Sequence, residues 1–193
     1  MNLIVRSVFI LLGLLGLTCS ANAAHAFNVE HRSVEFAERH YRFELVVTLD
    51  APADRVEAVL RDYEHYPQLD ERILEAKVLE RPEPDLAILQ TTLRACFGPF
   101  CRNVHRIERV TESHMGLVAI SDPERSDVKF GASYTALSPL EDGRSRVSYR
   151  TDIVPDFWVP SLVGRRFMLK TLEDATTTLF RNVERKAQAS DGS

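Results

Sequence analysis

The chain has 193 residues, 45% of them hydrophobic, so it is long enough and apolar enough to form one domain with its own core. Its 24 basic and 28 acidic residues give a formal net charge of -4. A mildly acidic chain offers no basic face for nucleic acid and little attraction for an anionic membrane, so we expect a neutral, apolar or protein partner.

The N-terminus has the pattern of a secretion signal. Arg6 precedes an uninterrupted apolar run at residues 8–17, which is too short for a membrane-spanning helix of about 20 residues. Small residues in an A-x-A pattern predict cleavage after Ala23 or after Ala26. We therefore interpret residues 1–23 as a signal peptide. The mature protein is expected in the periplasm or outside the cell, without a stable membrane anchor.

Lipidation at Cys19 is the alternative interpretation of this segment, because Cys19 lies just past the apolar run. Thr18 stands directly before it, where a lipobox has Gly, Ala or Ser, so signal-peptide cleavage is preferred. Cleavage would also remove Arg6 and leave 23 basic and 28 acidic residues in the mature chain.

The first elements predicted for the mature chain are strands. Residues 41–49 alternate apolar with mainly polar side chains, which is typical of a half-buried strand. Residues 24–40 come before it, and within them residues 28–36 fit either an additional strand or an ordered arm.

Two short helices are predicted next. The first begins after Asp50 and runs to about Tyr63, with Val56, Val59 and Leu60 at helical spacing and acidic residues in the first turn. Pro67 predicts a break. A second helix around residues 69–73 is then expected to lead into a strand at residues 76–79.

A meander and one long helix complete the domain. Turn residues separate strand-like runs at 86–96, 102–110, 115–121, 128–137 and 146–154, which favours an antiparallel sheet. A helix of about 39 Å is predicted for residues 158–183. Its apolar face consists of Leu162, Leu169, Leu172, Thr176, Leu179 and Val183. The domain is expected to span residues 41–187, followed by a disordered tail at 188–193.

Cys96 and Cys101 are the cysteines that remain after removal of the signal. A Gly98-Pro99 turn between two strand-like runs would place them opposite each other in a hairpin, so we predict a disulfide. A redox-active or metal-binding pair is the competing interpretation. Their spacing is not C-x-x-C, and no histidine or second cysteine pair completes a zinc site.

The order of these elements and three motifs resemble the START-like superfamily, which includes polyketide cyclases and coenzyme Q-binding proteins. The motifs are APADRV at 51–56 with LRDYEHYP at 60–67, the strand at 131–137, and PDFWVP at 155–160. The resemblance covers about residues 41–185 and points to an exported bacterial branch that carries the hairpin cysteine pair. It departs from the family at Ala58 or Val59, where many relatives have Trp. The resemblance implies an α+β helix-grip fold, in which a curved antiparallel sheet wraps around a long C-terminal helix.

A sheet of this kind leaves an internal space that binds apolar ligands. Counting alternate positions along the strands and the helix predicts the residues that line the cavity, although each has a plainer interpretation as ordinary core. These residues are Leu93, Ile107, Leu117, Phe130, Tyr134, Tyr149, Phe157, Trp158, Leu162, Leu169 and Leu172.

Three charged residues in the strands are candidates for polar groups in the pocket. Arg94, Arg106 and Asp152 could form an inward Arg–Asp pair that orients a ligand head group, although outward, solvated positions are the plainer interpretation. The five histidines beyond residue 26 lack ligand spacing, so we expect no metal and no cofactor, and we assign no catalytic residue.

Three functions remain open at this stage. The protein could be a carrier or sensor of a hydrophobic small molecule or lipid, such as a quinone, fatty acid or polyketide-like compound. It could be a cyclase, dehydratase or hydrolase, which needs a polar pair such as Tyr134 or Tyr149 with Asp152. It could also be a protein-interaction module with a narrow cavity and an exposed apolar patch. No oligomeric state is predicted.

Overall fold

The computed structural model describes residues 27–97, 100–159 and 164–189. Eight strands and three α-helices follow one another with one short 3-10 helix. Their bounds are β1 (Asn28–Ala37), β2 (His40–Leu49), α1 (Ala53–Arg61), η1 (Tyr63–His65), α2 (Tyr66–Leu69), β3 (Ile73–Glu83), β4 (Leu86–Phe97), β5 (Phe100–Ser113), β6 (Gly116–Ser121), β7 (Val128–Pro139), β8 (Ser145–Pro155) and α3 (Gly164–Ala189). The predicted signal peptide, Leu162 and residues 190–193 lie outside the described residues.

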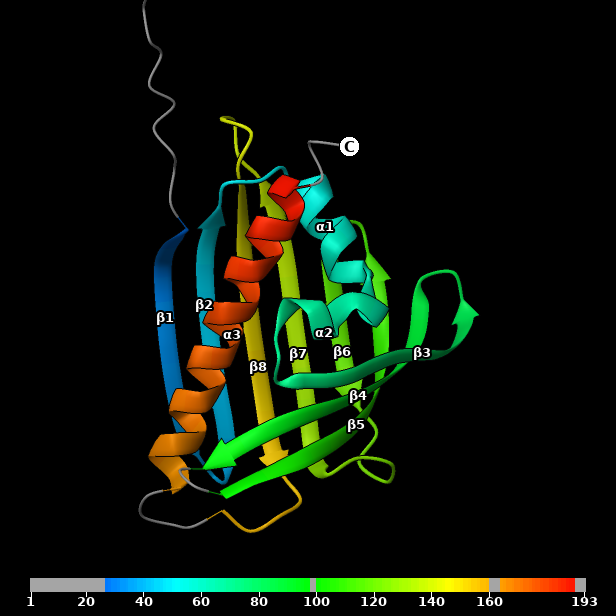
Figure 1. The fold of residues 1–193 in the computed structure, drawn as a ribbon, viewed down its shortest axis with the longest axis vertical. Coiled ribbons are helices and arrows are strands. Elements are labelled where there is room, and N and C mark those ends of the chain that lie inside the picture. Colours follow the sequence, from blue (N-terminus) through cyan, green and yellow to red (C-terminus); the bar gives the residue numbers. More distant parts are fainter. Residues whose placement is uncertain (1–26, 98–99, 160–163, 190–193) are drawn as a thin grey trace, which may run out of the picture.

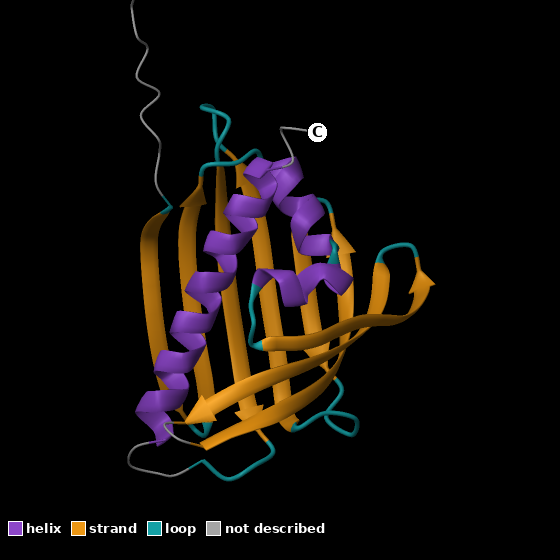
Figure 2. Ribbon diagram, in the orientation of Figure 1, coloured by secondary structure: helices purple, strands orange, loops and turns teal. Residues whose placement is uncertain are grey.

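The eight strands form one antiparallel sheet with the order β1-β2-β8-β7-β6-β5-β4-β3. The sheet is curved, and α3 runs diagonally across its concave face while α1 and α2 cover the neighbouring part of the same face (Figures 1 and 2). This is the predicted helix-grip fold, so the prediction of the fold class is confirmed. No helix among the described residues is long and apolar enough to cross a membrane.

The first two strands form an edge hairpin. In β2 the side chains of Phe43, Leu45 and Val47 are fully buried, and Glu44 and Val46 between them are more exposed, as the alternating pattern predicts. Residues 28–37 form the additional edge strand β1 and not an arm, and most of its side chains are exposed. Because β1 pairs only with β2, it extends the sheet without adding to the core.

The helical segment differs from the prediction at Pro67. This proline lies in the first turn of α2, which begins at Tyr66 and ends at Leu69, and a first turn tolerates proline because its N–H groups have no helical partner. The helix expected at residues 69–73 is therefore wrong, since Ile73 already begins β3. In α1 the predicted apolar face is buried through Val56, Val59 and Leu60.

The long helix also differs from its predicted bounds. The described part of α3 begins at Gly164, and Trp158 is not helical, so the predicted start at residue 158 is wrong. At the other end α3 continues past Val183 to Ala189, because Ala187 is fully buried and holds the last turns against the domain. Residues 188 and 189 are consequently helical and not part of a disordered tail.

The core occupies only one end of the space between sheet and helix. Leu49, Val56 and Val147 are fully buried there with Val183 and Ala187 from the C-terminal half of α3. The N-terminal half of α3 contributes only partly buried apolar residues such as Met168 and Leu172. The two halves of this helix therefore lie in different surroundings, one in packed core and the other beside a cavity.

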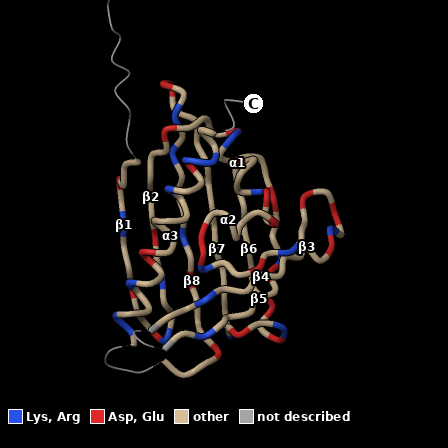
Figure 3. The backbone as a smooth tube through the Cα atoms, viewed as in Figure 1, with Lys and Arg blue, Asp and Glu red and all other residues tan. Residues whose placement is uncertain are grey.

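Charged residues of both signs are mixed along the described strands and helices (Figure 3). Many form local ion pairs, such as Arg72 with Asp70 at 2.5 Å and Arg144 with Asp142 at 2.6 Å. Ion pairs of this kind stabilise the surface only weakly. The exclusion of nucleic acid as a partner stays a prediction from charge.

Candidate ligand-binding site

A cavity of about 290 Å³ lies between α3 and the concave face of the sheet. Its wall is mostly apolar and comes from β3 to β8, the segment of short helices and residues 168–180 of α3. Representative wall residues are Leu89, Val104, Val110, Ile153 and Leu179. A concave, largely apolar space that several elements enclose has the character of a small-molecule site.

Small side chains of β7 and β8 leave room for the hollow, although Tyr149 and Ile153 of β8 also line it. Ser133 and Thr135 of β7 and Thr151 of β8 line the cavity. The large aromatic residues of β7, Phe130 and Tyr134, face the opposite side of the sheet and are about 40% exposed. Since hydroxyl-bearing side chains do not reach α3, the space in front of them stays empty.

Five of the predicted cavity residues lie in this wall. They are Leu93, Leu117, Tyr149, Phe157 and Leu172. Five others among the described residues do not: Ile107, Phe130, Tyr134, Trp158 and Leu169. Contact of any of these residues with a ligand stays a prediction.

Strand parity explains the misplaced strand residues. On β5, Val104, Arg106 and Glu108 face the cavity, so Ile107 between them must face outward. Ile107 is nevertheless buried, because the loop after β6 covers it and Ser126 bonds to its backbone N–H at 2.9 Å.

The segment between β8 and α3 holds the other displaced aromatic residue. Trp158 is 81% exposed and lies outside the cavity, whereas its neighbour Phe157 lines it. The guanidinium of Arg102 lies over the Phe157 ring at 4.1 Å, which fixes this ring at one end of the cavity.

The candidate Arg–Asp pair is not formed, and for Asp152 the plainer interpretation, a position outside the cavity, holds. Asp152 lies on the other face of the sheet, where it accepts hydrogen bonds from Arg42 at 3.1 Å and contacts His40 at 2.7 Å. Arg106 does face the cavity, and its partner there is Glu108 on the same strand. Arg94 lies at the exposed rim of the cavity.

Sequence reasoning missed Glu108, although the sequence contains the signal. Val104, Arg106, Glu108 and Val110 alternate along β5, so the two charged residues share a face with two valines. Because alternate residues of a strand share one face, valines that face the core place the charged residues between them on that face too. Buried charges of this kind need partners.

These polar groups form a cluster inside an otherwise apolar wall. Glu108 accepts hydrogen bonds from Arg106 and from the Ser121 hydroxyl, the latter at 3.4 Å. Burial alone would lower the pKa of Arg106, but the charge and the hydrogen bond of Glu108 outweigh it, so the pKa is raised. Burial raises the pKa of the nearby Tyr149. At neutral pH the cluster therefore holds one compensated ion pair and a protonated phenol.

A second buried carboxylate lies behind the cavity wall, next to the short helices. Glu112 accepts hydrogen bonds from the Tyr63 hydroxyl at 2.8 Å and from Arg81 at 3.0 Å. Burial, followed by the hydrogen bond to Glu112, raises the pKa of Tyr63 far above its ordinary value of 10.0. These bonds attach η1 to β5 and so fix the wall.

The predicted disulfide is confirmed. Cys96 and Cys101 are directly paired across the β4–β5 hairpin and are joined by a bond between their sulfur atoms. The hairpin tip lies at the cavity end that Ala95 and Met168 line.

The cavity wall contains no histidine among the described residues. Within residues 27–97, 100–159 and 164–189, no group of three or more metal-binding side chains comes together. His40 and His65 bind Asp152 and Asp62 instead, outside the cavity wall.

The family profile described as "Polyketide cyclase / dehydrase and lipid transport" matches residues 40–188, which is most of the chain. The chain belongs to this polyketide cyclase/dehydrase family. The resemblance seen in the sequence is thereby confirmed, and with it the START-like character of the domain. Membership supports binding of a hydrophobic ligand or cyclase-type chemistry in the cavity. A search of curated proteins finds no match.

Solved structures show the same fold at low sequence identity. The Zhui aromatase/cyclase from Streptomyces sp. R1128 is 17% identical with a TM-score of 0.64, and the alignment covers 77% of this chain and 94% of that one. A protein from Thermus thermophilus is 16% identical with a TM-score of 0.65, and the alignment covers 77% of this chain and 98% of that one. A START superfamily protein from Mycobacterium smegmatis is 19% identical with a TM-score of 0.60, and the alignment covers 75% of this chain and 97% of that one. Identities this low establish the fold that this family member shares with them, and no more.

Proposed function

We propose that this family member is exported and binds a hydrophobic small molecule or lipid in its internal cavity, as a carrier or sensor. The observation that carries the proposal is the cavity itself, a space of about 290 Å³ with a mostly apolar wall. An empty apolar space of this size sacrifices packing between α3 and the sheet. A ligand that fills it restores those contacts.

Two features support export. The apolar run at residues 8–17 and the A-x-A sites after it have the order of a signal peptide. The Cys96–Cys101 disulfide suits an oxidising compartment, where such bonds form and persist.

Enzymatic activity is the less supported alternative. The pair considered for it required Asp152, which lies on the far face of the sheet from Tyr149. Among the described residues, the polar groups that line the cavity include no histidine or cysteine, so a Ser–His or Cys–His pair does not line it. An interaction module would need a collapsed cavity, which this protein does not have.

The deciding experiment is extraction of the purified protein. The chain is expressed with its own N-terminal segment, purified from the periplasm and denatured, and the organic extract is examined by mass spectrometry. We expect a hydrophobic compound in stoichiometric amount, and a raised melting temperature when lipids or quinones are added to extracted, refolded protein. Repeated preparations with no bound compound and no thermal shift would overturn the proposal.

The same preparation tests export. Intact mass spectrometry is expected to show a chain that begins at Ala24 or Phe27 and is lighter by two hydrogen atoms because of its disulfide. A chain that retains Met1 in the cytoplasmic fraction would contradict export and leave ligand binding to be judged separately.

A further inference from the structure

Two directly paired residues place unused hydrogen-bonding groups at the cavity wall. Thr91 on β4 lies opposite Arg106 on β5 in the antiparallel register, and both side chains line the cavity. The Thr91 hydroxyl is buried and has no hydrogen-bond partner among the described residues. The same holds for Nε of Arg106, whose other end is held by Glu108.

Unpaired groups of this kind are rare in folded proteins, because burial removes their hydrogen bonds to water and no hydrogen bond within the protein replaces them. They lie side by side, and the surrounding wall is apolar at Leu89, Leu93 and Val104. A ligand that offers a hydrogen-bond acceptor at this point would remove the cost, while its hydrocarbon part contacts the rest of the wall. Two donors that flank an apolar space therefore mark the position of a ligand's polar atom.

The charges around the pair decide what kind of acceptor fits. Glu108 already neutralises Arg106 and is itself buried, with the Ser121 hydroxyl as a further donor. A ligand carboxylate or phosphate at this point would put a second anion beside Glu108 in a medium of low dielectric constant, where repulsion is strong. An uncharged acceptor such as a ketone, quinone or ester carbonyl brings no such repulsion.

We propose that Thr91 and Arg106 bind an uncharged carbonyl oxygen of the cavity's ligand and select neutral carbonyl compounds over fatty-acid anions. This inference rests on the proposed function and adds the polar half of the ligand to it. Arg109 is an exposed arginine of the same strand, β5, and does not line the cavity. It provides a matched control, since its side chain lies outside the proposed site.

The test is a competition series in the protein expressed with its own N-terminal segment and purified from the periplasm. A neutral fluorescent dye, N-phenylnaphthylamine, is bound first and then displaced by an alkane, a methyl ketone and a fatty acid of one chain length. We expect the ketone to bind about tenfold more tightly than the alkane, the gain typical of a hydrogen bond to a charged group, and the fatty acid to bind less tightly than the ketone.

Three variants assign the preference. Thr91→Val removes the hydroxyl with little change of shape and is expected to reduce the ketone preference about fivefold, the factor for loss of one neutral hydrogen bond. Arg106→Gln combined with Glu108→Gln removes both charges together, so that no buried charge is left unpaired, and is expected to abolish the preference. Arg109→Gln is expected to leave it unchanged. Melting temperature and the intact disulfide show that each variant is folded.

The outcomes are distinct. If dye and alkane bind but the ketone has no advantage, or if the fatty acid binds best, the carbonyl site is wrong while the hydrophobic cavity stands. If the preference survives in both the Thr91 variant and the double variant, these residues are not the anchor. If neither the dye nor any chain binds, the proposed function fails and this inference fails with it.

Discussion

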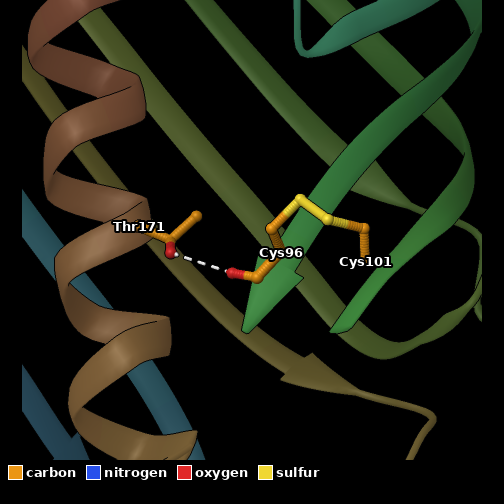
Figure 4. Close-up of a disulfide and its surroundings, with 3 residues drawn as sticks. All are labelled: Cys96, Cys101 and Thr171. Atoms are coloured by element: carbon orange, nitrogen blue, oxygen red, sulfur yellow. Dashed lines mark hydrogen bonds between the residues drawn. A yellow bond between two sulfur atoms is a disulfide. The ribbon is translucent and has the colours of Figure 1, made fainter. Parts of the chain in front are cut away.

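Oγ1 of Thr171 on α3 donates a hydrogen bond of 3.4 Å to the carbonyl oxygen of Cys96, so the long helix is tied to the disulfide-closed tip of the β4–β5 hairpin (Figure 4). The same half of the helix also meets β1, through the Arg32–Glu173 ion pair at 2.5 Å and through Arg165 over the Phe36 ring at 4.1 Å, but it faces the cavity and has little packed core to hold it. The hairpin tip therefore acts as the brace that keeps helix and sheet at a fixed separation.

Loss of the disulfide should weaken that brace. Replacing both cysteines by serine, Cys96→Ser with Cys101→Ser, is expected to lower the free energy of unfolding by about 2 kcal/mol, because a short closed loop then regains its freedom in the unfolded chain. Urea unfolding with and without reductant measures the effect. The reductant should reproduce the loss in the natural chain and change nothing in the double variant. Equal unfolding midpoints for the oxidised and reduced natural chain would refute the expectation.

Filling the cavity should impair binding without harming the fold. Ala175 lines the cavity from α3, and Ala175→Leu adds apolar volume there with a residue that favours helices. We expect ligand or dye affinity to fall about tenfold or more, with stability unchanged or higher. Ala189→Leu makes the same change at an exposed position of the same helix and should leave the affinity unchanged. Equal affinities for the two variants would show that the ligand lies elsewhere.

Phe180 should be the most sensitive aromatic residue of α3. Its side chain is 1% exposed and meets the Tyr149 ring edge-on at 5.5 Å, where core and cavity join. Phe180→Ala is expected to cost about 3 to 5 kcal/mol of stability, since the existing hollow becomes larger. Phe167→Ala removes a 42% exposed ring from the same helix and should cost less than about 0.5 kcal/mol. Chemical denaturation of the two variants compares them, and similar losses would contradict the assignment of Phe180 to the core.

Glu184 should make stability depend on pH. Burial, reinforced by the charge of Asp50, raises the pKa of Glu184 above its ordinary value of 4.5, and the backbone N–H of Asp50 at 2.7 Å offsets this only in part. The folded protein thus binds this proton more tightly than the unfolded chain. The contribution of Glu184 to stability therefore falls as the pH rises from 4.5 through the raised pKa.

The substitution Glu184→Gln tests the direction of this pH dependence of stability. Glutamine keeps an oxygen for the Asp50 N–H and carries no charge, so the variant should gain melting temperature relative to the natural chain as the pH rises from about 4 to about 7. A difference that stays constant or shrinks over this range would mean that Glu184 is ionised in the folded protein without cost.

The fold followed from the sequence more readily than the site did. Alternation in β2 and the apolar face of α1 reflect burial against a packed core, where side-chain polarity and position agree. The structure differs from the prediction where one residue type is compatible with more than one local structure. Pro67 was taken to break a helix, although it fits the first turn of α2 equally well.

At the cavity, the usual rule that large apolar side chains face inward does not hold for β7. The assumption that aromatic residues face inward placed Phe130 and Tyr134 in the wall, but a wall that encloses space must carry small groups such as Ser133 and Thr135. A bulge between Val128 and Phe130 also shifts the register at the start of β7. Charged residues are generally expected to face solvent, and this expectation was preferred for Arg106 over the alternation of side chains along β5. The alternation was the better guide, because it places both Arg106 and Glu108 in the cavity wall.

The strand order has a consequence for synthesis. Residues 41–49 of β2 find their second neighbour only in residues 145–153 of β8, about a hundred positions later. A growing chain cannot complete the sheet until nearly all of it has been made, and contacts between segments so distant form slowly. Until then β2 presents an unpaired apolar edge, so a truncated chain that ends before β8 is expected to aggregate rather than to accumulate as a smaller folded domain.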